Sequence, residues 1–162
     1  MTTKLTVTQS GDRDLIVIRV FDAPRDLVFQ AMSQPALVRR WMLGPPGWTM
    51  PVCEIDLRPG GKFRYVWRKE DGVEMGMGGV YLEVQAPERT VHEEVFDEDW
   101  TGGPARITTL LAEVGGVTTM TMTIQYASPE GRARALATPM LDGMESGYVT
   151  LDGLLAEMAQ PA

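Results

Sequence analysis

Hydrophobic and polar residues alternate along the middle of the chain, and this period of two predicts a series of β-strands. Phe63, Tyr65 and Trp67 share one face of such a strand, and basic side chains flank them. Turns such as Gly115-Gly116 separate neighbouring segments, so the pattern predicts an antiparallel meander. The expected strands are Lys4–Thr8, which has the weakest signal, Leu15–Phe21, Met50–Leu57, Lys62–Arg68, Val73–Gln85, Arg89–Phe96, Ala105–Val114 and Val117–Tyr126.

Three helices are expected outside these strands. Two are short, Pro24–Met32 with Asp22 as its N-cap and Pro35–Met42. The third should run from the N-cap Ser128 to about Met158, and Pro139 either kinks it or starts its main segment. At about 100° per residue its apolar side chains fall within an arc of about 120°, which is typical of an amphipathic helix. These side chains are Leu136, Met140, Met144, Tyr148, Leu151, Leu154, Leu155 and Met158.

The order of these elements predicts an α+β fold. We expect a curved antiparallel sheet of about six or seven strands, a long C-terminal helix across it and two short helices that close one end. The apolar face of such a sheet must be covered, and the long helix is the available cover. A curved sheet meets a helix only along the apolar stripe, which leaves space between them. No repeat or linker interrupts the pattern, so residues 1–162 are expected to form a single domain.

Composition removes several classes of function. One cysteine, Cys53, and one histidine, His92, exclude cysteine- or histidine-rich metal sites. A net charge of −7 repels the phosphates of nucleic acids. No apolar run is long enough to span a membrane, and the N-terminus does not look like a signal peptide. The acidic residues 93–99 lack calcium-loop spacing, and no helix follows the glycines of residues 76–79 as a nucleotide site requires. We therefore expect a cytoplasmic protein with no metal, no cofactor and no nucleic-acid partner.

His92 is the chain's one side chain of the usual general-base type. It lies on a predicted strand next to acidic residues that include Glu94. If Val91 and Val95 face inward, His92 faces solvent, but an inward Phe96 requires the opposite register. A surface or hydrogen-bonded strand histidine is the simpler interpretation.

Methionine is unusually frequent, with 11 residues, and it lines surfaces that accept ligands of varied shape. Several methionines share predicted inner faces with aromatic residues. These faces are interpreted either as ordinary core or as the wall of an apolar ligand cavity, and spacing leaves both open. Within this set we expect Met144 to face Trp67 and Met120 across the cavity. The candidate lining residues are Trp41, Phe63, Tyr65, Trp67, Met75, Met77, Met120, Met122, Met140, Met144, Tyr148 and Leu151.

Several segments together resemble one protein family. They are similar to the SRPBCC superfamily, which has the START-like or birch-pollen-allergen-like helix-grip fold, and within it to the family named for the activator of Hsp 90 ATPase homologues. The resemblance covers about Leu15 to Met158 and implies a sheet wrapped around the C-terminal helix. The matching segments are Val20–Phe29, Arg40-Trp41, Gly44-Pro45, Pro59–Tyr65, Gly79–Val84, Pro87–Arg89, Gly143–Tyr148 and Leu151–Leu154.

The resemblance also implies binding of a small hydrophobic molecule between sheet and helix. The chain departs from the family pattern at Met42, where a second aromatic is usual, and at Tyr148, where tryptophan is usual, so ligand identity does not carry over. The superfamily also contains cyclases and dehydratases of polyketide-like or aromatic substrates. For such chemistry Tyr65, His92 and Glu94 are the candidate acid–base residues. A co-chaperone-like interaction role is the weakest alternative, because the chain is too short for a second chaperone-binding domain, and a homodimer is left open.

Overall fold

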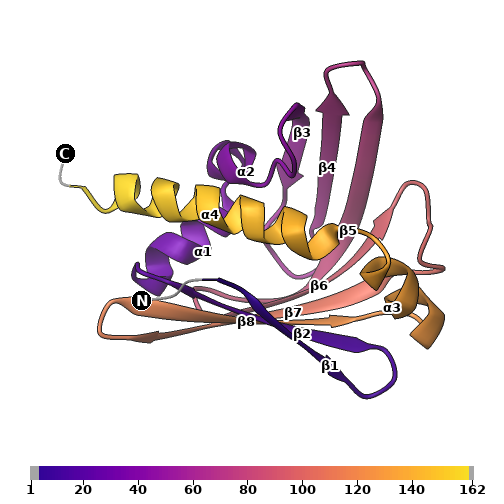
Figure 1. Ribbon diagram of the computed structural model, residues 1–162. Helices are drawn as coiled ribbons and strands as arrows, with labels where there is room; N and C mark the ends of the chain where they lie inside the picture. The colour runs from indigo at the N-terminus through magenta and orange to yellow at the C-terminus, as the bar shows by residue number, and fades with distance from the viewer. Residues whose placement is uncertain (1–3, 161–162) are drawn as a thin grey trace.

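One antiparallel sheet of eight strands organises the protein, which is described here by a computed structural model over residues 4–160. The strand order is β1-β2-β8-β7-β6-β5-β4-β3 (Figure 1). The weak N-terminal segment does form a strand, because Thr6–Ser10 pairs along its whole length with β2, and this takes the sheet beyond the six or seven strands expected. The strands are β1 (Thr6–Ser10), β2 (Asp14–Phe21), β3 (Trp48–Ile55), β4 (Lys62–Lys69), β5 (Glu74–Gln85), β6 (Arg89–Phe96), β7 (Ala105–Val114) and β8 (Val117–Gln125).

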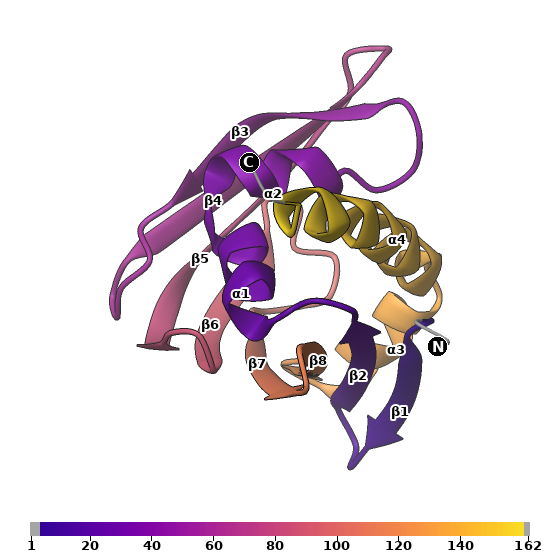
Figure 2. The same ribbon diagram turned by 90° about the vertical axis from the view of Figure 1, so that its left-hand side faces the viewer.

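The sheet is curved, and helices lie on its inner side. Figure 2 shows the strands as an arc around the helices, from β3 and β4 at one edge to β1 at the other. The ladder has register shifts between Thr49 and Val52 and between Tyr81 and Glu83, and such irregularities bend and twist a sheet. The structure therefore confirms the helix-grip fold, with a long C-terminal helix lying along a curved sheet.

Four helices accompany the sheet: α1 (Arg25–Ser33), α2 (Pro35–Trp41), α3 (Pro129–Leu136) and α4 (Met140–Met158). The hydroxyl of Ser128 accepts a hydrogen bond from the Gly131 N–H at 3.0 Å, which confirms it as an N-cap. Pro139 starts the main segment, because a proline ring cannot continue the hydrogen bonding of α3 into α4. The N-cap expected at Asp22 is wrong, since α1 begins after Pro24 with no side-chain cap.

Inward-facing side chains form rows across the concave face. Cross-strand pairing places Leu15, Ile124, Ile107, His92 and Tyr81 in one such row. The four neighbours of His92 in this row are buried. The register therefore settles the open orientation: His92 faces the concave side, beneath the helices.

Helix α4 packs tightly on only one part of this face. Phe21 of β2 and Met120 of β8 are fully buried there against Leu151, Leu154 and Leu155 of α4. A second cluster of buried residues, which includes Phe63, Tyr65 and Trp67, lies on the strands farther around the arc. Within residues 4–160, no helix is both long enough and apolar enough to cross a membrane.

Candidate ligand-binding cavity

A cavity of about 530 Å³ lies on the concave side of the sheet, with walls from the strands, α2 and α4. Binding sites for small molecules commonly have about 300–1,000 Å³. Helix α4 borders the cavity with its N-terminal half, and two of its wall positions are Gly143 and Gly147, which add no side-chain volume. This position is the one at which the sequence predicted space between a curved sheet and a helix.

The tryptophan side chains on the wall present apolar rings. The Trp41 Nε1–H donates to the Ala31 carbonyl at 2.8 Å, and the Trp67 Nε1–H donates to the Met42 carbonyl at 2.8 Å. Both indole donors are thus used within the protein. What these two residues offer a ligand is aromatic surface.

All but two of the predicted lining residues lie on the cavity wall. Those that do are Trp41, Phe63, Tyr65, Trp67, Met75, Met77, Met122, Met140, Met144 and Tyr148.

The two exceptions are Met120 and Leu151, for which a place on the wall was expected wrongly. Both are 0% exposed and belong to the cluster in which α4 meets β2 and β8 directly. Arg19 draws the helix onto the sheet at this point, because it bonds to two carboxylates of α4 and pairs with Met120 across the ladder. Met144 accordingly borders the cavity together with Trp67 but not with Met120.

Several wall residues were not expected from the sequence, and some of them continue the predicted inner faces. The alternation that includes Met77 continues through Gly79 to Tyr81, and the one that includes Met122 continues to Tyr126. Extending these faces by one or two positions would have found both tyrosines. The other missed residues include Phe29, Met32, Trp48, Phe96, Trp100, Ile107, Thr109 and Ile124.

Two ionisable side chains, His92 and Glu94, form a pair on the cavity wall. His92 Nε2 lies 2.8 Å from Glu94 Oε1, and the two side chains are only 18% and 22% exposed. The His92 ring packs edge-on against Phe63, with centroids 5.1 Å apart, and against Tyr81 at 5.9 Å. A surface histidine is therefore ruled out, whereas a hydrogen-bonded strand histidine fits.

Three tyrosines lie on the same wall as this pair. Burial, with the charge of Glu94 among the further causes, raises the pKa of Tyr81 to about 12, and burial and Glu94 raise that of Tyr126 to about 12. Burial is also the largest cause that raises the pKa of Tyr65, followed by Tyr81, Cys53 and Glu94. All three phenols thus stay protonated at neutral pH, and the Tyr126 hydroxyl donates to Met140 Sδ at 3.6 Å. Around the His92–Glu94 pair the wall thus carries a carboxylate, an imidazole and these phenols, and Glu88 and Arg89 are further charged residues on the wall.

The family model for Activator of Hsp90 ATPase homolog 1-like protein matches residues 22–156. The chain belongs to this family. Among solved structures, a crystal structure of a Rhodobacter sphaeroides protein has 32% identity and a TM-score of 0.90, covering 95% of this chain and 99% of its own. Protein Ms6760 of Mycobacterium smegmatis has 26% identity and a TM-score of 0.81, covering 98% and 99%. A comparison with the curated proteins gives no match.

A further solution structure, of the AHSA1-like protein from Aeromonas hydrophila, shares the fold with a TM-score of 0.71 at 18% identity, covering 91% of this chain and 97% of its own. Within the family the two departures noted from the sequence, Met42 and Tyr148, both border the cavity. Tyr148 packs edge-on against Phe21, with centroids 5.6 Å apart, and lies 5.9 Å from Trp41. Both side chains therefore belong to the cavity wall.

A metal site would need several acidic, histidine or cysteine side chains close together. Over residues 4–160, no three of the histidine, cysteine, aspartate and glutamate side chains converge as metal ligands would. Cys53 is buried behind the wall, and burial raises the pKa of its thiol despite the opposing effect of Arg39. The cavity is the feature that carries a functional argument.

Proposed function

We propose that this family member binds a small hydrophobic molecule in the cavity between the curved sheet and α4. The supporting observation is the cavity itself, which has about 530 Å³ and is lined by many aromatic and methionine side chains. Folded proteins fill their interiors to the density of organic crystals, so a space of this size is not ordinary packing. The twelve residues expected from the sequence remain the proposed contacts, except Met120 and Leu151.

Replacing Met144 with tryptophan tests the proposal. Met144 is half-buried and borders the cavity from α4. In a close-packed core the larger ring would cost about 1–3 kcal/mol of unfolding free energy. In a cavity it buries apolar area worth about 25 cal/mol per Å², so we expect stability to be kept or raised. The ring also fills the space, so the neutral fluorophore Nile red should bind the wild type and not Met144→Trp.

Val149→Trp is the matched control, because Val149 lies on the same helix and is 59% exposed. It should leave both stability and Nile red binding unchanged. A loss near about 3 kcal/mol in Met144→Trp, together with no Nile red binding by the wild type, would mean that this region is ordinary core. Native mass spectrometry of the purified protein, which reveals a co-purifying apolar ligand, is the independent measurement.

The His92–Glu94 pair supports an alternative, a cyclase- or dehydratase-type enzyme that acts on a polyketide-like or aromatic substrate. A general base must be close to the proton that it abstracts, and these two side chains border the cavity at 2.8 Å from one another. The alternatives differ in a simple observable. A binding module returns its ligand unchanged, a dehydratase returns it without one water, and a cyclase returns an isomer of the same mass that chromatography separates from the substrate.

The cavity does not bear on the expectations about location, domain number and partners. We propose a cytoplasmic location and one domain on the sequence grounds given above. A homodimer stays a prediction that light scattering can test, and a co-chaperone-like role stays the weakest alternative.

A further inference from the structure

The polar groups on the cavity wall favour some classes of ligand over others. Glu94 is an acceptor in its ionised form, and the His92 contact occupies only its Oε1 atom. The three phenols near it are protonated, since burial, with the negative charge of Glu94 among the further causes, raises the pKa of Tyr65, Tyr81 and Tyr126. This polar region therefore holds one strong acceptor, Glu94, and uncharged phenols, of which Tyr126 already donates to Met140 Sδ.

We propose that the cavity selects apolar molecules that carry a hydrogen-bond donor, an amine or a hydroxyl group, and discriminates against those that carry a carboxylate. The inference rests on the proposed ligand-binding function and specifies the class of ligand. A donor group can bond to the second oxygen of Glu94, and a charge-assisted bond of this kind is stronger than a neutral one. A carboxylate placed there would meet a like charge in a poorly solvated site.

The other charged side chains on the wall do not reverse this preference. Arg89 could attract an anion, but its Nε–H already donates to Glu83 Oε2 at 3.0 Å. Glu88 adds a further negative charge to the wall. His92 contacts Oε1 of Glu94, and the second carboxylate oxygen is not part of that contact.

Three probes with the same ten-carbon chain test the proposal: decylamine, decanol and decanoate, each used below its micellar concentration. Each competes with Nile red for the protein at about pH 8 and physiological salt, which screens the net negative charge of the surface. We expect decylamine to displace Nile red at a concentration at least about tenfold lower than decanoate, with decanol between them.

Glu94→Gln should bring decylamine and decanoate to within about threefold of one another, because it keeps the shape of the side chain and removes its charge. Glu93→Gln is the matched control. Glu93 precedes Glu94 on β6, faces the other side of the strand and contacts Arg106 at 3.2 Å. It removes the same charge from the chain and should keep the wild-type preference.

The outcomes separate the two proposals. Equal displacement by decylamine and decanoate from the wild type, or an unchanged ratio in a folded Glu94→Gln, overturns the ligand class and leaves the binding function standing. No binding of Nile red by the wild type overturns the binding function itself. The wild-type comparison alone decides the ligand class if Glu94→Gln does not fold.

Discussion

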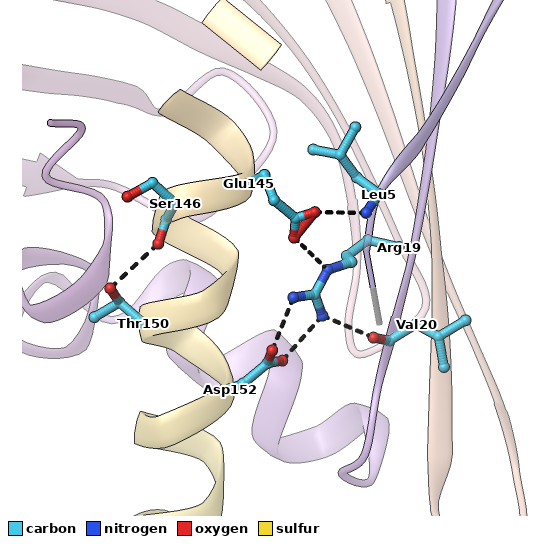
Figure 3. A network of polar contacts seen from close by, with 7 residues as sticks. All are labelled: Leu5, Arg19, Val20, Glu145, Ser146, Thr150 and Asp152. Atoms are coloured by element: carbon cyan, nitrogen blue, oxygen red, sulfur yellow. Dashed lines mark hydrogen bonds and ion pairs between the residues drawn. The ribbon is translucent and has the colours of Figure 1, made fainter. Parts of the chain in front are cut away.

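Replacing Arg19 with methionine should lower the free energy of unfolding by about 3 kcal/mol. The Arg19 side chain is 0% exposed beneath α4, where it joins two carboxylates (Figure 3). Its Nε–H donates to Glu145 Oε1 at 3.0 Å, and its two terminal nitrogens donate to Asp152 at 3.0 and 2.8 Å. Burial opposes the charge, but the bonds to Asp152 and then Glu145 outweigh it and raise the pKa of Arg19.

The magnitude follows from what the substitution leaves behind. Removing one partner of a buried ion pair typically costs about 3–5 kcal/mol, because the remaining charge loses its compensation. Here Glu145 and Asp152 are 19% and 32% exposed, so water partly solvates the orphaned carboxylates and the lower end of the range applies. In urea, with a slope of roughly 2 kcal/mol per molar, this loss moves the unfolding midpoint by about 1.5 M.

Arg40→Met is the matched control. Arg40 Nη2 contacts Glu157 at 2.7 Å, a distance as short as those of Arg19, but the side chains are 50% and 60% exposed. An exposed pair contributes little, so the midpoint should not move measurably. The triple variant Arg19→Met, Glu145→Gln, Asp152→Leu should recover most of the loss, because it removes the uncompensated charges and keeps an acceptor for the Leu5 N–H. A loss below about 1 kcal/mol in Arg19→Met, or no recovery in the triple variant, would refute this reasoning.

Two further predictions concern the tyrosines and a glycine. The chain has four tyrosines, and burial raises the pKa of each, to about 12 for Tyr81 and Tyr126. At about pH 10.5 the native protein should show little phenolate absorbance, whereas the urea-unfolded protein should show more than half of its maximal phenolate absorbance. The reason is that the phenol of free tyrosine has a pKa of about 10. The higher pKa of the tyrosines in the folded state contributes to stability, and this contribution is complete below about pH 10 and is lost as the pH rises towards 12. Phenolate absorbance of the native protein at about pH 10.5 would contradict the prediction. Gly79→Ala should lower the free energy of unfolding in urea by about 1–3 kcal/mol, because the added Cβ would collide with the Glu93 carbonyl and the Phe63 ring. The control is Gly153→Ala on α4, where the added Cβ meets nothing and should stabilise the protein by up to about 1 kcal/mol. Equal effects of the two substitutions would refute the argument.

Local patterns predicted the fold well because each strand follows its own alternation. Segments from Phe63 to Tyr126 formed strands near the expected bounds, and Ser128 capped a helix as its side chain allows. The orientation of His92 could not be read in the same way, because Val91 and Phe96 both look like inner positions. Pairing with Tyr81 and Ile107 on neighbouring strands decides it, and that information is not local.

Alternation along a strand predicted which side chains face the helices, but not which of them border the cavity. Alternation identified Met120 and Met122 on the same side of β8, yet Met120 is packed under α4 while Met122 borders the cavity. The difference depends on where the helix touches the sheet. Arg19 governs that contact, and an arginine in the strand Asp14–Phe21 looks like an exposed position until Glu145 and Asp152 are placed opposite it.

Arg19 and Glu94 both lie beneath the helices, but they differ in how many of their hydrogen bonds the protein supplies. This difference distinguishes a structural role from a role in ligand binding. Arg19 bonds to Glu145, Asp152 and the Val20 carbonyl, so its guanidinium is satisfied on every nitrogen by protein atoms. Glu94 uses one oxygen for His92 and turns towards a cavity. A buried network that is complete rigidifies a fold, whereas an incomplete one is costly unless another molecule completes it. Substitution of Arg19 should therefore act on stability and that of Glu94 on ligand preference, with the two effects independent of one another.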